Sequence, residues 1–291
     1  MRNFILATFF LCCAFTSDKK AYQLFNQKGK LVEYEQVVTD ALEADIVLFG
    51  ELHNNPICHW LELQLLKDLH TKKKDKLILG AEMFEADDQV VLDEYLQKKI
   101  TSRHLETESK LWNNYATDYK PLVEFALANN LPFVATNIPR RYASMVAKSD
   151  LTVLDSLGND VKKWIAPLPI EVDLNLPGYK KMMNTGGESG MAHGHGMNMG
   201  NLAKAQAIKD ATMAHFILSN WQSGQTFLHV NGSYHSDNFE GIVWYLKKQN
   251  PQLKILTIAS VEQPEVTKLQ DKSQNLATYV LAIPSDMTKT Y

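Results

Sequence analysis

Short, continuously apolar runs alternate with amphipathic segments along most of the chain. Such runs are typical of strands covered on both faces of a sheet. They read DIVLFG, KLILGAEMF, LPFVATN, QTFLHVNG, LKILTIAS and ATYVLAI, and KLVEY precedes them as an early strand or hairpin arm. A strand followed by a helix, repeated, predicts an α/β fold, with a mostly parallel sheet flanked by helices and a smaller helical subdomain.

The segments between the runs carry helical periodicity. One helix begins at Asn55-Pro56, a capping residue followed by a proline that suits the first helical position. Further helices are expected at 87–99, 121–129, 139–147, 202–221 and 238–249. Residues 155–200 break the alternation and show no strand pattern. We therefore expect one α/β domain over residues 22–291, with residues 86–130 and 155–222 contributing a helical subdomain or lid.

Composition excludes several classes of protein. With 291 residues, 45% of them hydrophobic, the chain can bury a large core, which excludes disordered and collagen-like classes. A formal net charge of -3 and only one short lysine block, at 72–76, provide no general attraction to phosphate backbones. Nucleic acid is not expected as a partner.

The first residues, 1–17, have the build of a signal peptide. An arginine precedes an apolar run from Phe4 to Phe15 that is too short to span a bilayer comfortably. Cys12 and Cys13 lie where a lipoprotein signal places its acylated cysteine, and simple cleavage near Ala14 is the alternative. Either reading predicts an exported protein, and the remaining Cys58 leaves no disulfide framework.

Polar residues follow four of the predicted strands. They are Glu51 and His53, Glu82 and Glu85, Asn137 with Arg140 and Arg141, and His235 with Asp237. Because the carboxyl ends of parallel strands meet at one edge, these side chains are expected to form one site. Glu51, His53, Glu82 and His235 are the candidate ligands of a divalent metal ion, or acid/base groups, with Arg140 holding an anion.

Some of these residues have simpler structural interpretations. Glu85 and Asp87 suit the start of the next helix. His59, one turn into its helix, is expected to be a surface or packing residue rather than a ligand, and His229 a core histidine. The chain contains no HExxH, GxSxG or Gly-rich phosphate loop, so zinc-protease, esterase and nucleotide-binding readings lack support.

A second candidate site lies in GGESGMAHGHGMNMGN, at 186–201. His193 and His195, with neighbouring methionines, are nitrogen and thioether donors suited to haem iron or copper. The alternative is a Gly/Met loop with incidental histidines. The helix predicted next places Gln206, Asp210 and Met213 on one face, which is expected to turn towards the same cavity.

Five ordered segments resemble a known family. VLFGELHNN, GAEMFE, TNIPRRYASMV, AQAIKDATMA and VNGSYHSD are similar to the ChaN family of haem-binding uptake proteins, in the Tiki/TraB/erythromycin-esterase-like superfamily. That superfamily is marked by two glutamates, here Glu51 and Glu82, and a GxxH segment, here Gly232 to His235. The resemblance implies an exported protein, periplasmic or lipid-anchored to a bacterial outer membrane, that binds haem for iron uptake together with outer-membrane machinery.

In the family, two haems lie face to face at a homodimer interface, iron bound by a tyrosine of one subunit and propionates by a histidine of the other. The resemblance makes Tyr142 the first candidate for the iron ligand and Tyr179 the second. Arg141 or Arg140 would meet a propionate or lower the tyrosine pKa, and His193 or His195 would reach a propionate.

Two function classes therefore stay open. One is a haem carrier that uses a tyrosine and the His/Met loop. The other is a metal-dependent hydrolase of the superfamily kind, which would use the glutamates and histidines at the sheet edge. A binding protein is the stronger expectation, because the resemblance is to haem-binding relatives.

Overall fold

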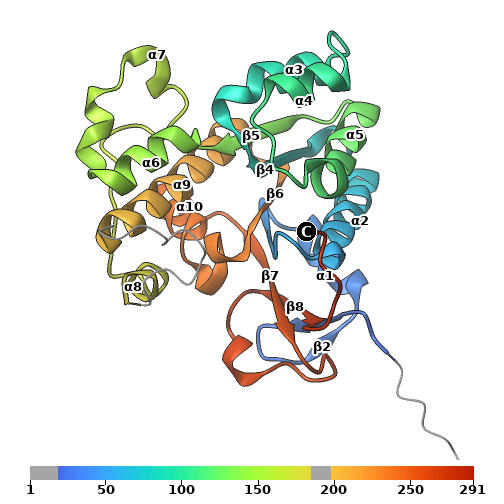
Figure 1. Cartoon of the computed structure of the whole chain (residues 1–291). Helices are drawn as coiled ribbons and strands as arrows, with labels where there is room; N and C mark the ends of the chain where they lie inside the picture. The colour runs from blue at the N-terminus through green and yellow to red at the C-terminus, as the bar shows by residue number, and fades with distance from the viewer. Residues whose placement is uncertain (1–18, 185–197) are drawn as a thin grey trace, which may run out of the picture.

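The computed structural model describes residues 19–184 and 198–291. Its centre is one eight-stranded sheet with the strand order β2-β1-β8-β7-β3-β6-β4-β5. Figure 1 shows α9 and α10 on one side of the sheet and α2 and α5 on the other. Within the described ranges, no helix is both long and apolar enough to cross a membrane. The predicted signal peptide at 1–17 lies outside these ranges.

The sheet is mostly parallel, as the sequence predicts. β1 is antiparallel to both β2 and β8, whereas every pair from β8 to β5 is parallel. The strands are β1 (Gln23–Asn26), β2 (Leu31–Val32), β3 (Ile46–Glu51), β4 (Leu77–Glu85), β5 (Phe133–Asn137), β6 (Thr226–Gly232), β7 (Ile255–Gln263) and β8 (Tyr279–Pro284). Every predicted apolar run contributes a strand, which confirms the α/β class. β1 was not predicted, because its four residues carry no long apolar run.

The helices agree with the predicted ones in place, with four additions. They are α1 (Tyr34–Leu42), α2 (Pro56–Lys73), α3 (Gln89–Leu96), α4 (Ser102–Glu108), α5 (Lys120–Asn129), α6 (Arg140–Lys148), α7 (Asn159–Lys162), α8 (Pro177–Asn184), α9 (Met199–Asn220) and α10 (Ile242–Gln249). The additions are α1, α4, α7 and α8, of which α7 and α8 lie in the segment expected to be part of a helical subdomain. α1 begins at Tyr34, inside the run expected to be a strand, because pairing ends at Val32.

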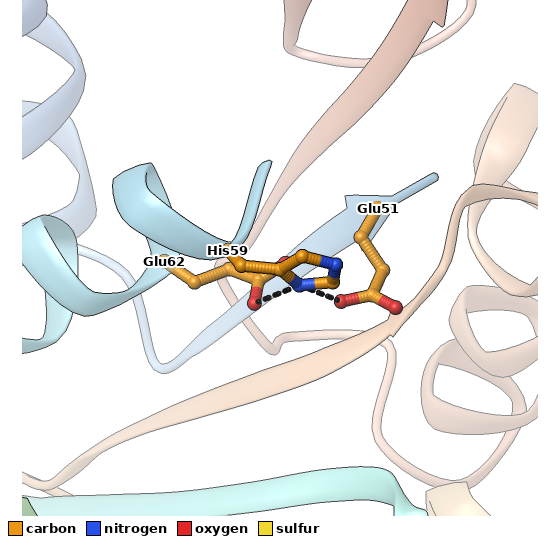
Figure 2. A group of neighbouring side chains, drawn as sticks. All are labelled: Glu51, His59 and Glu62. Carbon is orange, nitrogen blue, oxygen red and sulfur yellow. Dashed lines mark ion pairs between the residues drawn. The ribbon is translucent and has the colours of Figure 1, made fainter. Parts of the chain in front are cut away.

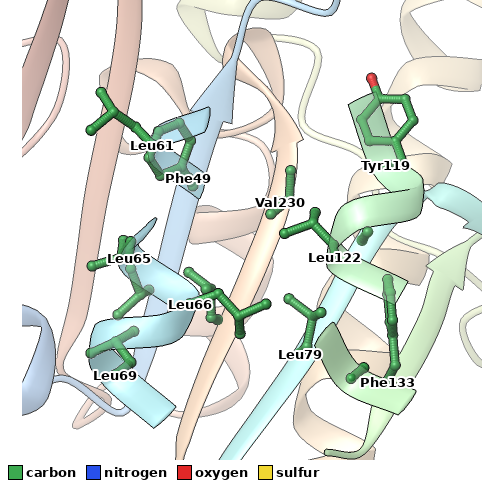
Figure 3. Close-up of a cluster of buried hydrophobic side chains, with 14 of the residues drawn as sticks. Phe49, Leu61, Leu65, Leu66, Leu69, Leu79, Tyr119, Leu122, Phe133 and Val230 are labelled. Carbon is green, nitrogen blue, oxygen red and sulfur yellow. The ribbon is translucent and has the colours of Figure 1, made fainter. Parts of the chain in front are cut away.

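The core forms two layers, one on each face of the sheet. Along β3, Val47 and Phe49 pack in one buried cluster, whereas Ile46 and Leu48 pack in another. This alternation follows from the period of two in a strand. Figure 3 shows the first layer, in which leucines of α2 and Leu122 of α5 pack against residues of β3, β4, β5 and β6.

The two segments predicted to contribute helices to a subdomain lie on different faces. Residues 86–130 supply Leu92, Leu105 and Leu122 to the layer under α2, whereas residues 155–222 supply Met213 and Ile217 to the opposite layer. The division into a main domain and a helical subdomain stays a prediction.

Candidate functional site

Three neighbouring strands bring predicted site residues to one edge of the sheet. β3, β6 and β4 are adjacent and parallel, so their carboxyl ends lie side by side. Glu51 ends β3, Glu82 lies near the end of β4, and His235 ends the 3-10 turn η5 (Ser233–His235) that follows β6. The fold therefore gathers residues that are up to 184 positions apart, from 51 to 235, at the edge where α/β sheets place their sites.

Glu82 lies at an irregularity of β4. The register between β4 and β5 shifts between Ala81 and Glu85, and such bulges re-aim side chains. One oxygen of the Glu82 carboxylate accepts a hydrogen bond of 2.8 Å from the backbone N–H of Gly232, and the other lies 3.1 Å from Nε2 of His235. Both oxygens of this buried carboxylate therefore have a partner.

His235 is held between two buried carboxylates. Its Nδ1 lies 2.5 Å from Asp210 of α9, whose second oxygen accepts a hydrogen bond of 2.6 Å from the Tyr179 hydroxyl. We call Tyr179, Asp210, His235 and Glu82 the His235 array. Burial lowers the pKa of His235, but Glu82 and Asp210 outweigh it and raise that pKa to about 10. The imidazole is therefore positively charged at neutral pH.

His53 is the partly exposed member of this edge. Its Nδ1 lies 2.6 Å from Oε1 of Glu51, and 36% of its side chain is exposed. A Cβ on Gly232 would come within 2.8 Å of the His53 ring, so the glycine of the GxxH segment provides room for this imidazole. Burial lowers the pKa of His53, and the nearby Glu51 and Glu82 carboxylates raise it above its ordinary value.

Another histidine, His59 of α2, also contacts Glu51. Nδ1 of His59 is 3.3 Å from Oε2 of Glu51 and 3.5 Å from Oε2 of Glu62, and its Nε2 is 3.4 Å from Asp118. We call Glu51, His59, Glu62 and Asp118 the His59 cluster. The side chain of His59 is 6% exposed, so it is not at the surface as one reading of the sequence allowed. The missed signal is the i, i+3 pair His59 and Glu62 directly after a strand that ends in glutamate.

The electrostatics of the His59 cluster are unbalanced. Burial raises the pKa of Glu51, but contacts with His53 and His59 hold it at about 2. Burial and the Glu51 charge raise the pKa of Glu62 well above its ordinary value. Burial lowers the pKa of His59, yet the two glutamates raise it to about 11. The single imidazole of His59 is thus the shared partner of three carboxylates, those of Glu51, Glu62 and Asp118.

Arg140, Arg141 and Tyr142 open helix α6, which follows the carboxyl end of β5 at the same edge of the sheet. The guanidinium of Arg141 donates a hydrogen bond of 2.6 Å to Asp87, donates one of 3.2 Å to the Tyr142 hydroxyl and lies 4.5 Å from the centre of its ring. Arg140 is 73% exposed, with its Nε 4.0 Å from Glu85. Tyr142 is itself buried, with 6% exposed.

The structure places the remaining predicted residues as follows. Gln206 and Asp210 of α9 both contact His235, so these two lie on one face of the helix, and that this face turns towards the 186–201 segment stays a prediction. Met213 instead packs in the core, because it lies on the side of α9 that faces the sheet. His193 and His195 lie outside the described residues, so their predicted role with haem stays a prediction.

The two candidate tyrosines differ in how their hydroxyls are enclosed. The hydroxyl of Tyr179 donates to Asp210, and its ring packs against Ala203 and Ala207 of α9. The hydroxyl of Tyr142 meets the side chain of Arg141, which is 43% exposed. The Tyr142 hydroxyl thus has a partly exposed partner and the Tyr179 hydroxyl a buried one, although both rings pack against α9. Tyrosinate is an established ligand of haem iron.

The four residues predicted as metal ligands or catalytic groups are largely engaged with one another. Oε1 of Glu51 accepts from Tyr119 and meets His53, and both Glu82 oxygens are partnered. His235 is enclosed by Glu82 and Asp210. Of the four, His53 alone has a substantially exposed side chain, which leaves limited room for a hydrolytic site at this edge.

Comparisons with known proteins place the chain in a family. A family model for haem-binding uptake proteins, Tiki superfamily, ChaN, matches residues 37–246. None of the curated proteins compared is a match. The solved structure of ChaN from Campylobacter jejuni, with cofacial haem binding, is similar at a TM-score of 0.67 and 16% identity, covering 91% of this chain and 97% of that chain. At this identity the likeness shows the fold alone.

A weaker likeness concerns the hydrolase alternative. A solved structure of the erythromycin esterase EreC has a TM-score of 0.46 and 10% identity, and the match covers 84% of this chain and 77% of that chain. A similarity this low does not support an esterase activity for this chain.

Proposed function

This chain belongs to the ChaN family of haem-binding uptake proteins, within the Tiki superfamily, and on that premise we propose that it is a haem carrier with Tyr142 as the iron ligand. The observation that supports this choice is the partner of the Tyr142 hydroxyl. Its hydroxyl accepts a hydrogen bond from Arg141, a long and partly exposed side chain, while its ring packs with Ala205 and Ile208 of α9.

The surroundings of Tyr142 suit an anionic ligand. Three partly or largely exposed cations lie near Tyr142: Arg140 (73% exposed) and Arg141 (43%) begin α6, and Lys110 (49%) pairs with the acidic residues that follow β4. Arg141 and Lys110 share Asp87, whereas Arg140 has only a distant contact with Glu85. Arg140 is therefore the cation most available to a propionate, and Arg141 the one that would stabilise a tyrosinate.

The finer parts of the proposal come from the sequence and the family. We infer export from the signal-like residues 1–17, with lipidation at Cys12 or Cys13 as the means of attachment to an outer membrane. We also infer a homodimer in which His193 or His195 of one protomer meets a propionate of haem bound by its partner, and a role in iron uptake.

A haem titration tests the iron ligand. Protein lacking residues 1–17 would be titrated with ferric haem and followed by absorbance and by size-exclusion chromatography. A saturable Soret shift with conversion to a dimer is expected. Tyr142→Phe should lose the tyrosinate charge-transfer band and weaken binding at least about tenfold, since a ligand bond is lost.

Tyr179→Phe is the matched control, because it removes a tyrosine hydroxyl that is bound to Asp210. It should retain the haem spectrum. If Tyr142→Phe keeps the spectrum and affinity of the parent while Tyr179→Phe loses them, the assignment to Tyr142 is wrong. If the parent shows no Soret shift, the haem-carrier proposal itself fails.

A further inference from the structure

We propose that Glu51, His59 and Glu62 form a binding site for one divalent transition-metal cation, distinct from the haem proposed at Tyr142. The three residues come from the end of β3 and the first turns of α2, and they are buried, with exposed fractions of 1%, 7% and 0%. Figure 2 shows the His59 ring between the two carboxylates.

The first reason is a group of acceptor atoms that lack hydrogen-bond donors. Oε2 of Glu51, Nδ1 of His59 and both carboxylate oxygens of Glu62 are buried and have no hydrogen-bond partner. Buried polar atoms are almost always partnered, and an exception calls for an unseen ion or water. Glu62 is completely buried and directs a carboxylate to a histidine that already faces Glu51.

The spacing of the atoms suits a metal ion. One ligand atom from each residue can be chosen so that all three lie within 4.8 Å of one another. Nδ1 of His59 lies 3.3 and 3.5 Å from the two glutamate oxygens. A tetrahedral cation with bonds of about 2.1 Å would hold neighbouring ligand atoms about 3.4 Å apart. These separations are long for charge-assisted hydrogen bonds, which favour about 2.7–2.9 Å.

The groups behind the three residues orient them as metal ligands are usually oriented. Nε2 of His59 lies 3.2 Å from the backbone oxygen of His53 and 3.4 Å from Asp118, which places a hydrogen on Nε2 and leaves Nδ1 facing the glutamates. Asp118 in turn accepts from Asn114 and Thr290. The Tyr119 hydroxyl donates to the other oxygen of Glu51.

Asp118 and Tyr119 come from an unusual helix. They lie in the π-helical turn η3 (Tyr115–Tyr119), which precedes α5. Such turns are rare and frequently occur at functional sites. Here the π-turn places a carboxylate against Nε2 of His59 and a hydroxyl against Glu51, so one local distortion supports two of the three ligands.

Charge gives a further reason. Within the described part of the chain, no lysine or arginine forms an ion pair with Glu51, Glu62 or Asp118. A proton on Nδ1 of His59 would supply one positive charge and one donor for two glutamates. A divalent cation would balance both glutamates at once. Nitrogen and carboxylate donors without sulfur favour Zn²⁺, Mn²⁺, Fe²⁺ or Co²⁺ over soft cations.

The test uses haem-free protein, so that the result does not depend on haem binding. Protein carrying His193→Ala and His195→Ala, which removes the two histidines of the 186–201 segment, would be refolded with Zn²⁺ or Mn²⁺ because the site is buried. Metal retained after dialysis would be counted by elemental analysis, and thermal unfolding measured with and without metal. We expect about one equivalent retained and a higher melting temperature with metal.

Glu62→Gln is the decisive variant, and Glu106→Gln, at an exposed surface ion pair, is its control. Glu62→Gln should bind metal at least about tenfold more weakly, and added metal should raise its melting temperature less, because the neutral amide supplies no negative charge to the cation. Glu106→Gln should change neither property. The proposal is overturned if the parent retains no metal or if Glu62→Gln retains as much as the parent.

Discussion

The His235 array and the His59 cluster are built from the same parts and differ in how completely they are partnered. Each has a tyrosine hydroxyl on a carboxylate and a buried histidine between two carboxylates. Tyr179 donates to Asp210 in the first, and Tyr119 donates to Glu51 in the second. In the array, the backbone N–H of Gly232 donates a hydrogen bond to Glu82. In the cluster, neither oxygen of Glu62 accepts a hydrogen bond.

This difference is why we interpret the His235 array as a structural ion pair and propose metal ligands in the His59 cluster. A buried carboxylate whose oxygens are all satisfied can balance a histidine without help. A carboxylate with the same neighbour but no donors needs a cation or a proton. Side-chain type alone does not distinguish the two sites, because both contain a glutamate within 3.5 Å of a histidine.

The largest expected effect comes from breaking the array. His235→Leu would leave Glu82 and Asp210 buried without a counter-charge, and we expect a loss of about 3–5 kcal/mol in the free energy of unfolding. Urea unfolding at pH 7 measures it. His215→Leu on α9 is the control, since His215 forms no ion pair in the described structure, and its effect should stay within about 1 kcal/mol. A loss for His235→Leu no larger than that of the control would show that the array is not a balanced charge group.

The pH dependence of stability sharpens the comparison through His229, a buried histidine of β6 whose side-chain partners are the neutral Thr136 and Asn231. Burial lowers the pKa of His229 to about 4, below its ordinary value of 6.5. Below pH 6.5 this histidine is therefore protonated in the unfolded chain but not in the folded one. The free energy of unfolding falls towards pH 4 by up to about 3 kcal/mol.

The measurement for His229 is urea unfolding at pH 7, 6 and 5 for the parent and His229→Gln. The variant should lose less stability on acidification, and equal slopes for the two proteins would contradict the expectation. His235 has the opposite sign. Because its folded pKa is raised to about 10, its contribution is complete below pH 6.5 and disappears as the pH rises through 10.

The smallest effect tests the parallel between the two tyrosines. Tyr179→Phe and Tyr119→Phe each remove one hydroxyl that donates to a buried carboxylate, at 2.6 and 2.7 Å. A hydrogen bond to a charged group contributes about 1.5–3 kcal/mol, so both variants should lose a similar amount in urea unfolding. If Tyr179→Phe lowers the free energy of unfolding and Tyr119→Phe does not, the two hydroxyls do not have equivalent roles.

Much of the fold follows from local patterns. The apolar runs have the length and continuity of buried parallel strands, and each of them supplies a strand. Asn55 caps α2 by accepting from the N–H of Ile57, with Pro56 at the first helical position, as the sequence predicts. α1 was missed because the apolar run before it resembled a longer strand.

The site could be predicted only in outline. Residues after strand ends converge because parallel strands share an edge, so Glu51, Glu82 and His235 were identifiable from their positions. The partners that decide their chemistry come from elsewhere in the chain. Asp210 lies on α9, Asp118 on a π-turn, and Thr290 near the end of the chain, and no local pattern links them.

The sequence by itself determined the α/β class, the resemblance to a haem-binding family and the identity of the polar strand ends, because these depend on periodicity and on short ordered segments. Only the tertiary structure decided which carboxylates are satisfied. That property depends on donors brought from distant elements, such as Gly232 for Glu82 and their absence around Glu62. It also revealed that the Tyr142 hydroxyl accepts a hydrogen bond from the partly exposed Arg141, whereas the Tyr179 hydroxyl donates to the buried Asp210.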